Sequence, residues 1–395
     1  MLRFLTAGES HGPALTTIVE GMPSGVPICE DAINCQLARR QVGFGRGSRM
    51  QIEHDTARFL SGVRFGKTLG SPIALLIENR DWVNWTERMS QFSTPETPVP
   101  PITLPRPGHA DLPGMIKYDT DDLRNILERS SARETAARVA AGAVARCVLD
   151  ALGISIMSHV LVIGGVEAHP TGSDPFEWAI AAEASDLRCA DADAAERMRG
   201  RIRQAAREGD TLGGIVQVIV TGLPVGLGSH VQWDRRLDGQ LAGALMSIPA
   251  IKGVEFGLGF DVAQRPGSQV HDALYAEGTR IVRHTNNAGG VEGGMTNGEP
   301  LMMQIAMKPI PTLSRPLPSV DLSTGNAVQA HAERSDVCAV PAAGVVAEAM
   351  TAFVLTSCIV EQFSADSFRE LADAVQRRTA LSNEILHLNR PSRNQ

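Results

Sequence analysis

Apolar residues gather in short runs along the chain, and glycine or proline bounds each run. The four clearest runs cover residues 15–19, 73–77, 215–220 and 301–305. Short apolar runs between residues that favour turns are typical of β-strands. The pattern therefore predicts at least these four strands.

Longer stretches have the composition of helices. Alanine-rich residues cover 131–152 and 342–360, and an amphipathic pattern covers 368–388. The first stretch opens with Ser131-Ala132-Arg133-Glu134, a capping-box pattern in which the serine and the glutamate satisfy backbone N–H groups at a helix start. The segment 168–210 is charged and alanine-rich, which predicts a solvated helical insertion.

The two halves of the chain carry the same short motifs in the same order. Gly-x-Pro-x-Gly follows one strand of each half, at residues 21–25 and 222–226. Glu-Arg-Ser precedes the alanine-rich helix of each half, at residues 128–130 and 333–335. A third match precedes another strand: Gly66, Gly70 and Pro72, then Gly294, Gly298 and Pro300. Short matches of turn-forming residues also arise by chance, but their common order favours a duplication.

A duplication predicts one large α+β domain over residues 1–395. Its two pseudo-symmetric halves would cover about 1–165 and 211–360, with the insertion at about 168–210 between them and the C-terminal helix at about 368–388 beyond them. With 395 residues and 43% hydrophobic content, the chain is long enough to bury the core that such a fold needs.

Composition and charge exclude several classes of protein. The net charge of -7 disfavours a general nucleic-acid or anionic-membrane binder, because both partners are themselves negative. Six scattered cysteines form no Cys-x-x-Cys pair, which predicts neither a metal site nor a disulfide framework and fits the reducing cytoplasm. We find no signal-peptide pattern and no run of roughly 18 unbroken apolar residues, the length of a membrane span. We therefore expect a cytoplasmic protein with no membrane partner.

A cluster of arginines stands out in this acidic chain. Four guanidinium groups and three glycines fall within residues 39–49: Arg39, Arg40, Gly43, Gly45, Arg46, Gly47 and Arg49. The planar fork of arginine suits phosphate and carboxylate, and glycine lets the backbone approach a ligand. The alternative is a solvated basic face. The chain has neither a Walker loop nor a Gly-x-Gly-x-x-Gly motif after a strand. The sequence motifs therefore predict no dinucleotide site.

Two histidines lie in irregular segments with glycine neighbours. His11 stands between Ser10 and Gly12, and His109 ends a proline-rich loop over 81–107. An imidazole can give or take a proton near neutral pH, although a lone histidine is more often a turn or core residue. A loop of this length inside a compact domain is often functional.

Three further features border the predicted helices. Asp336 precedes the second alanine-rich helix, where we expect it to act near the helix N-terminus as a cap. Ser130, Ser131 and Arg133 begin the first helix, whose N–H groups form a ready anion site. Lys308 and the glycines of 286–294 are the last candidates for functional residues. From these residues alone we infer only an anion site with histidines nearby.

Five strings in this order resemble the chorismate synthase family. They are Gly-Glu-Ser-His-Gly at 8–12, Arg-Pro-Gly-His-Ala-Asp at 106–111, Arg-Ser-Ser-Ala-Arg-Glu-Thr at 129–135, Met-Ser-Ile-Pro-Ala-Ile-Lys-Gly-Val-Glu at 246–255 and Arg-Ser-Asp at 334–336. The resemblance implies a β-α-β sandwich that assembles as a homotetramer. It also implies a lyase that removes phosphate and a ring proton from 5-enolpyruvylshikimate 3-phosphate by 1,4-anti elimination, giving chorismate.

The resemblance further implies a need for reduced FMN without net redox change. NADPH would serve only indirectly, as a source of reduced flavin, and an external flavin reductase is expected because the sequence shows no dinucleotide motif. His11 resembles the acid at the leaving phosphate, His109 the partner of the flavin N1 and O2 edge, and Asp336 the base that relays a proton from flavin N5.

The same resemblance assigns binding roles by position. The residues expected to hold substrate anions are Arg40, Arg46, Arg106, Arg133 and Arg334. Those expected to line the flavin are Arg129, Ser130, Ser131, Ala250, Gly293, Lys308, Thr312 and Arg334. Pro249 and the run 308–312 depart from the family pattern, which puts the flavin contacts there in question.

Two other functions would use the same residues. A flavin-independent phosphatase or lyase on a small phosphorylated carboxylic acid would need similar arginines and histidines. A nucleic-acid-binding protein could use residues 39–49, although the net charge of -7 argues against it.

Overall fold

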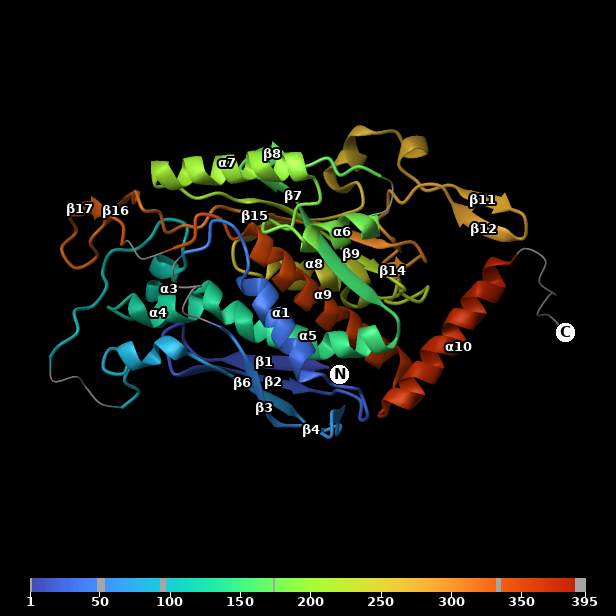
Figure 1. Cartoon of the computed structure of the whole chain (residues 1–395), viewed down its shortest axis with the longest axis horizontal. Helices are drawn as coiled ribbons and strands as arrows, with labels where there is room; N and C mark the ends of the chain where they lie inside the picture. Colours follow the sequence, from blue (N-terminus) through green and yellow to red (C-terminus); the bar gives the residue numbers. More distant parts are fainter. Residues whose placement is uncertain (1, 48–53, 93–96, 173–174, 332–334, 388–395) are drawn as a thin grey trace.

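The fold is a sandwich in which two antiparallel sheets enclose a layer of helices (Figure 1). This computed structural model describes residues 2–47, 54–92, 97–172, 175–331 and 335–387. The layers confirm the predicted α+β class and β-α-β sandwich. All four strands expected from the apolar runs are present.

The first sheet has the strand order β1-β2-β6-β3. Its strands are β1 (Arg3–Ala7), β2 (Ala14–Glu20), β6 (Ile73–Glu78) and β3 (Ala57–Ser61). Alternate residues of β6, namely Ile73, Leu75 and Ile77, are buried. This alternation directs one face of the sheet toward the helices, because successive side chains of a strand point to opposite faces.

The second sheet has the order β10-β15-β9-β7-β8. Its strands are β10 (Ile251–Phe256), β15 (Leu301–Met307), β9 (Gly214–Thr221), β7 (Ser155–Ile163) and β8 (Val166–Glu167). Leu301, Met303 and Ile305 of β15 are buried, so this sheet also presents one apolar face to the helix layer.

The helix layer consists mainly of α1 (Glu30–Gln41), α5 (Thr135–Ala151), α8 (Leu237–Met246) and α9 (Val340–Phe363). Helices α5 and α9 cross closely, since a Cβ atom added at Gly142 would lie 2.5 Å from the Cα of Ala349. Helix α9 has the length and a mean hydropathy of 1.9 that a membrane span needs, but 83% of that window is buried in the protein. It is therefore the central core helix.

The start of α5 differs from the predicted capping box. Ser131 accepts a hydrogen bond from the N–H of Arg133 at the start of a short 3-10 helix (Ala132–Glu134). The carboxylate of Glu134, however, accepts from Arg138 at 2.9 Å and does not reach back to the cap. An arginine one turn along the helix thus competes successfully for this side chain.

The two sheets share one topology. Strands β1, β2, β6 and β3 correspond in pairing and chain order to β7, β9, β15 and β10. In each half a threonine hydroxyl donates to a loop proline carbonyl at 2.6 Å and accepts from the N–H three residues after that proline at 2.9 Å. The residues are Thr68, Pro23 and Val26 in one half and Thr296, Pro224 and Leu227 in the other.

These matched hydrogen bonds support the proposed duplication. The domain bounds at about 165 and 211 stay a prediction. Of the second Glu-Arg-Ser motif, Glu333 and Arg334 lie outside the described residues.

The insertion is helical as predicted, but the expectation that it is solvated is wrong. It contains α6 (Pro175–Glu183) and α7 (Ala192–Glu208). Met198 and Ile202 of α7 are fully buried in the main core, because their four-residue spacing places them on one face of the helix. The charges of α7 lie on the other face.

The remaining elements are short or peripheral. Helix α10 (Phe368–Leu386) matches the predicted C-terminal helix and extends away from the sandwich (Figure 1). The proline-rich loop begins with a 3-10 helix (Arg80–Asn84), and its described residues form no further helix or strand before α3. The other helices and strands are α3 (Asp111–Tyr118), α4 (Arg124–Ser130), β4 (Val63–Arg64), β5 (Lys67–Thr68), β11 (Leu274–Glu277), β12 (Arg280–Arg283), β13 (Val291–Glu292), β14 (Met295–Thr296), β16 (Pro318–Val320) and β17 (Ala327–Gln329).

Candidate active site

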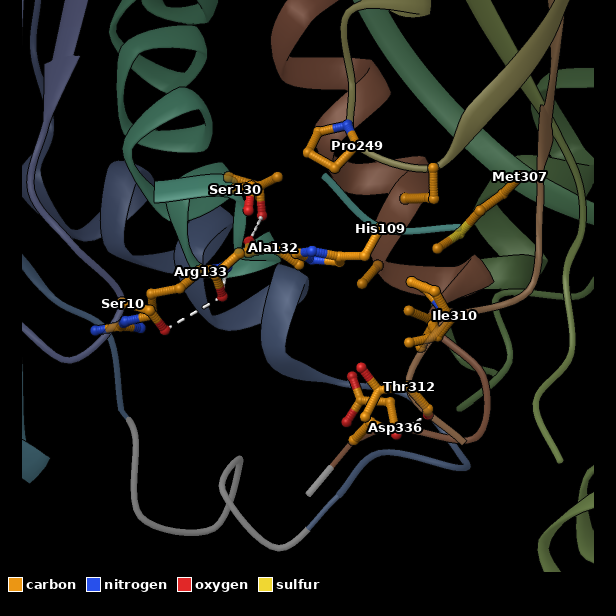
Figure 2. A pocket seen from close by; sticks show the side chains of 18 of the residues that line it. Ser10, His109, Ser130, Ala132, Arg133, Pro249, Met307, Ile310, Thr312 and Asp336 are labelled. Atoms are coloured by element: carbon orange, nitrogen blue, oxygen red, sulfur yellow. Dashed lines mark hydrogen bonds between the residues drawn. The ribbon is translucent and has the colours of Figure 1, made fainter. Parts of the chain in front are cut away.

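A cavity of about 440 Å³ opens between the starts of α5 and α9. Its volume falls in the range of about 300–1,000 Å³ typical of small-molecule sites. Residues just before α5 and residues of the segment after β15 face each other across it (Figure 2). Most of the predicted site residues line it: His11, Arg40, Arg46, Arg106, His109, Ser130, Ser131, Arg133, Ala250, Lys308, Thr312 and Asp336.

Two predicted residues, Arg129 and Gly293, do not join this set. Arg129 donates to the carbonyl oxygens of Thr6 at 2.8 Å and Gly8 at 3.1 Å, and so ties α4 to the first sheet. Gly293 lies in the turn between β13 and β14, where its φ is 60°. Neither residue lines the cavity, and Arg334 lies outside the described residues. Their assigned binding roles stay predictions.

A buried carboxylate that the sequence did not reveal holds two of the arginines. Asp55 Oδ2 accepts from Arg40 Nη2 at 2.6 Å, and its other oxygen accepts from Arg133 Nη1. The Asp55 side chain is only 1% exposed. Burial opposes its ionisation, but the charges of Arg40 and Arg133 outweigh burial and lower the pKa of Asp55. Asp55 thus fixes both guanidinium groups at the cavity wall.

Asp336 pairs with Arg46 and Gly47 of the loop at residues 45–47 and does not cap a helix. Its Oδ2 lies 2.9 Å from Arg46 Nη1, and its Oδ1 accepts from the Gly47 N–H at 2.6 Å. The N-cap of α9 is Ala339, and no side chain caps it. The expectation of a capping role is therefore wrong, because Asp336 lies too far ahead of α9 and nearer to the loop at residues 45–47.

The insertion supports this loop from behind. Gly45 has a φ of 88°, and a Cβ atom there would lie 2.9 Å from Ile202 of α7. Phe44 donates its N–H to the carbonyl of Asp186 at 3.0 Å, and the guanidinium of Arg203 lies 5.4 Å from the Phe44 ring centroid. The helical insertion therefore positions the loop that carries Arg46.

His109 belongs to a cluster with Arg106 and Asp111. His109 Nδ1 lies 2.5 Å from Asp111 Oδ1, and Arg106 Nε donates to Asp111 Oδ2 at 2.8 Å. Arg106 Nη1 also donates to the Thr312 hydroxyl at 3.1 Å. Burial opposes ionisation of Asp111, but hydrogen bonds from His109 and Arg106 hold its pKa well below the usual range. Asp111 ends the Arg-Pro-Gly-His-Ala-Asp string at 106–111, but no role was predicted for it.

His11 has its own buried carboxylate and a stacked indole. Glu128 Oε1 lies 2.9 Å from His11 Nδ1, and Glu128 Oε2 accepts from the His11 N–H at 2.7 Å. The rings of His11 and Trp85 stack with centroids 3.8 Å apart and an interplanar angle of 29°. Burial opposes ionisation of Glu128, but hydrogen bonds from His11 and Arg124 lower its pKa. Trp85 lies in the proline-rich loop over 81–107. The length of this loop predicts a function, but no sequence signal marks Trp85 itself.

The opposite wall of the cavity is largely apolar. It is formed by Ile248, Pro249, Ala250, Met307 and Ile310. Pro249 and Ile310, the latter from the run 308–312 that departs from the family pattern, both lie in this wall, and Figure 2 shows them with Met307 on the side that faces Ser130.

Lys308 adds a cation at the edge of the apolar wall. Its Nζ donates to the Gly108 carbonyl at 2.5 Å. Burial and the nearby charge of Lys252 lower the pKa of Lys308. A flat aromatic group with a phosphate would find both an apolar surface and cations here. Among the described residues, no three His, Cys, Asp or Glu side chains come together as a metal site.

Nearly the whole chain is similar to proteins of one family. The family model for chorismate synthase matches residues 2–360. A chorismate synthase from Geobacter sulfurreducens is 57% identical over 379 residues, which cover 94% of this chain and 96% of the relative. Another from Moorella thermoacetica is 59% identical over 370 residues, covering 93% and 95%. A crystal structure of chorismate synthase matches with a TM-score of 0.77 at 45% identity, covering 96% of this chain and 98% of that one.

Proposed function

Since the chain belongs to the chorismate synthase family, we propose that the cavity between α5 and α9 is its active site. The chain is a carbon-oxygen lyase that converts 5-enolpyruvylshikimate 3-phosphate to chorismate by 1,4-anti elimination of phosphate and a ring proton. The observation that carries the site assignment is the convergence of four arginines and two histidines on one cavity.

The arginines fit the charges of this substrate. Its phosphate and two carboxylates need several cations, and Arg40, Arg46, Arg106 and Arg133 all line the cavity. Each arginine is already oriented by a carboxylate, namely Asp55, Asp336 or Asp111. Guanidinium groups that are fixed before binding lose less conformational entropy when the substrate arrives. We propose that Arg334 joins them.

The apolar wall and the cations fit reduced FMN. Figure 2 shows Thr312 on the side of Ile310 and Ser130 opposite, and Ala250, Lys308 and Ser131 also line the cavity. Beside them, Arg40 Nε, which belongs to an arginine proposed to hold the substrate, is buried and has no hydrogen-bond partner among the described residues. When bound between these groups, reduced FMN would supply electron density to the allylic system of the substrate and would recover it, with no net oxidation.

The side chains of this protein would divide the proton chemistry. We propose that His11 donates a proton to the leaving phosphate, that His109 supports the flavin at its N1 and O2 edge, and that Asp336 receives a proton at its carboxylate. Arg129 and Gly293 remain proposed flavin contacts. We also propose a cytoplasmic homotetramer served by an external flavin reductase, with NADPH only an indirect source of reduced flavin.

An anaerobic assay tests this function directly. The purified protein is mixed with 5-enolpyruvylshikimate 3-phosphate with and without reduced FMN, and both phosphate and chorismate are measured. We expect equal amounts of both products, and only with reduced flavin. Phosphate release without flavin would instead support the flavin-independent phosphatase or lyase.

Asp336→Asn tests the assigned proton acceptor. Asparagine can still accept a hydrogen bond from the Gly47 N–H, but it cannot take a proton. We expect the variant to fold and bind flavin, yet to turn over at least about 10²-fold more slowly. Asp373→Asn, at an exposed position of α10, is the matched control. Normal turnover of Asp336→Asn would remove Asp336 from the chemistry.

A further inference from the structure

We propose that Glu128 and Trp85 are positioning residues for His11. Glu128 keeps a proton on Nδ1 and Trp85 holds the plane of the ring, so that proton exchange at His11 takes place at Nε2. The inference rests on the proposed role of His11 as the acid at the leaving phosphate.

Glu128 holds His11 at two points. One carboxylate oxygen accepts from the backbone N–H at 2.7 Å, and the other lies 2.9 Å from the ring Nδ1. The Glu128 side chain is 2% exposed, and of the pair only His11 lines the cavity. Arg124 Nη1 donates to Glu128 Oε1 at 3.0 Å, which keeps the carboxylate in place and balances its charge.

The chemistry of a carboxylate decides which ring nitrogen carries the proton. The pKa of Glu128 is lowered, so Glu128 is ionised near neutral pH and can only accept hydrogen bonds. Nδ1 of His11 must therefore be protonated in both the neutral and the cationic ring. The proton that His11 gains or loses is then the one on Nε2, and the tautomer is set by the partner of the other nitrogen.

Trp85 fixes the rotation that Glu128 alone leaves open. Its ring stacks on His11 at 3.8 Å, and its Nε1 donates to Asp81 Oδ2 at 2.9 Å. The guanidinium of Arg124 lies 5.2 Å from the Trp85 ring centroid. Asn79, just before this loop, donates to the carbonyl of Gly12 at 2.8 Å. The proline-rich loop thus braces the His11 segment at one end and delivers Arg106 and His109 at the other.

The test measures the tautomer separately from the activity. Protein labelled with 15N at histidine is studied by NMR without substrate or flavin, and the His11 signals are assigned by their loss in His11→Gln. We expect the Nδ1–H tautomer for His11 in the wild type. In Glu128→Gln, whose amide can donate or accept, we expect that preference to be lost. Exposed His230 serves as the internal reference.

Kinetics complete the test. We expect Glu128→Gln to lower kcat at least about 10-fold while KM for the substrate changes less than about 3-fold, because a histidine in the wrong tautomer still permits binding. Trp85→Phe keeps a stacking ring and should retain most activity, whereas Trp85→Ala should lose it. Glu134→Gln is the control, since Glu134 is also buried but contacts Thr6 and Arg138.

Specific outcomes would overturn the inference. An Nε2–H tautomer at wild-type His11 would do so even if Glu128→Gln failed to fold, and so would normal turnover of a folded Glu128→Gln. Full activity of His11→Ala would instead contradict the proposed role of His11, and the NMR result would still stand by itself.

Discussion

The two histidines of the cavity have the same kind of partner but different surroundings. Each ring has a buried carboxylate at Nδ1, Glu128 for His11 and Asp111 for His109. Asp111 is shared with Arg106, which itself lines the cavity. Glu128 is shared with Arg124, which lies on the same helix and pairs with it four residues apart.

This difference separates positioning from binding. At His109, one carboxylate orients both a histidine and an arginine assigned to the substrate, so a change at Asp111 affects two functions. At His11, the Glu128 carboxylate contacts only one residue that lines the cavity, which is His11 itself. We therefore expect changes around His11 to act on turnover, and changes around His109 to act on stability and binding together.

The largest expected effect is the loss of turnover or of flavin binding when one of the two histidines is replaced. His11→Ala should lower kcat by about 10²- to 10⁴-fold, the usual contribution of a placed acid or base, with flavin affinity unchanged. His109→Ala should weaken binding of reduced FMN. Anaerobic flavin titration and steady-state kinetics on both variants measure this separation. Equal loss of flavin affinity in the two variants would break the comparison.

The next effect concerns the shared carboxylate. Asp111→Asn leaves the buried Arg106 guanidinium without its ionised partner, and removing one member of a buried pair costs about 3–5 kcal/mol. We expect this loss in the free energy of unfolding, measured by urea denaturation. Glu128→Gln, where Arg124 is more exposed, should lose less. A difference in the reverse order would show that Glu128 carries the greater structural role.

Acid sensitivity gives a smaller effect with a defined sign. Folding lowers the pKa of both Asp111 and Glu128, so each carboxylate stabilises the fold above its unfolded pKa, near 4, and loses this effect as the pH falls through its folded pKa. Below about pH 4, the free energy of unfolding of Asp111→Asn should fall less steeply than that of wild type, by up to about 1.4 kcal/mol per pH unit. Denaturation curves from pH 5 to about 2 measure the slopes, and parallel slopes would contradict the assignment.

The smallest expected effect is that of replacing Arg124, and Arg106 provides the comparison. Arg124→Lys keeps a cation four residues from Glu128 and should change stability by less than about 1 kcal/mol and kcat by less than about 3-fold. Arg106→Lys loses the fork that contacts Asp111 and Thr312, so it should weaken substrate binding by about 1.5–3 kcal/mol. Equal effects on substrate binding would mean that Arg106 is not a ligand for the substrate.

The sequence predicted the residues that face the cavity better than those behind it. His11, His109 and the arginines lie in contiguous, unusual strings, and their convergence could be anticipated. Two of their carboxylate partners come from distant segments, since Glu128 is 117 residues from His11 and Asp55 is 78 residues from Arg133. No local pattern marks such pairs.

Two errors have the same origin. Asp336 precedes a helix in sequence and was expected to cap it, but the loop at residues 45–47 is the nearer partner in space. The insertion was expected to be solvated because of its charge, although the spacing of Met198 and Ile202 already allowed a buried face. In both cases a contact between distant segments decided the outcome.

The shared topology of the two halves allows matching positions of the cavity to be compared. Counted from the Glu-Arg-Ser motif, Ser131 holds the position in one half that Asp336 holds in the other. Both residues line the same cavity, one from the segment that precedes each core helix. A hydroxyl bonded to Ser10 and a carboxylate bonded to Arg46 thus stand at matching places in the repeat. Under the proposed duplication, these two positions have diverged, and the cavity presents a hydroxyl on one side of the repeat and a carboxylate on the other.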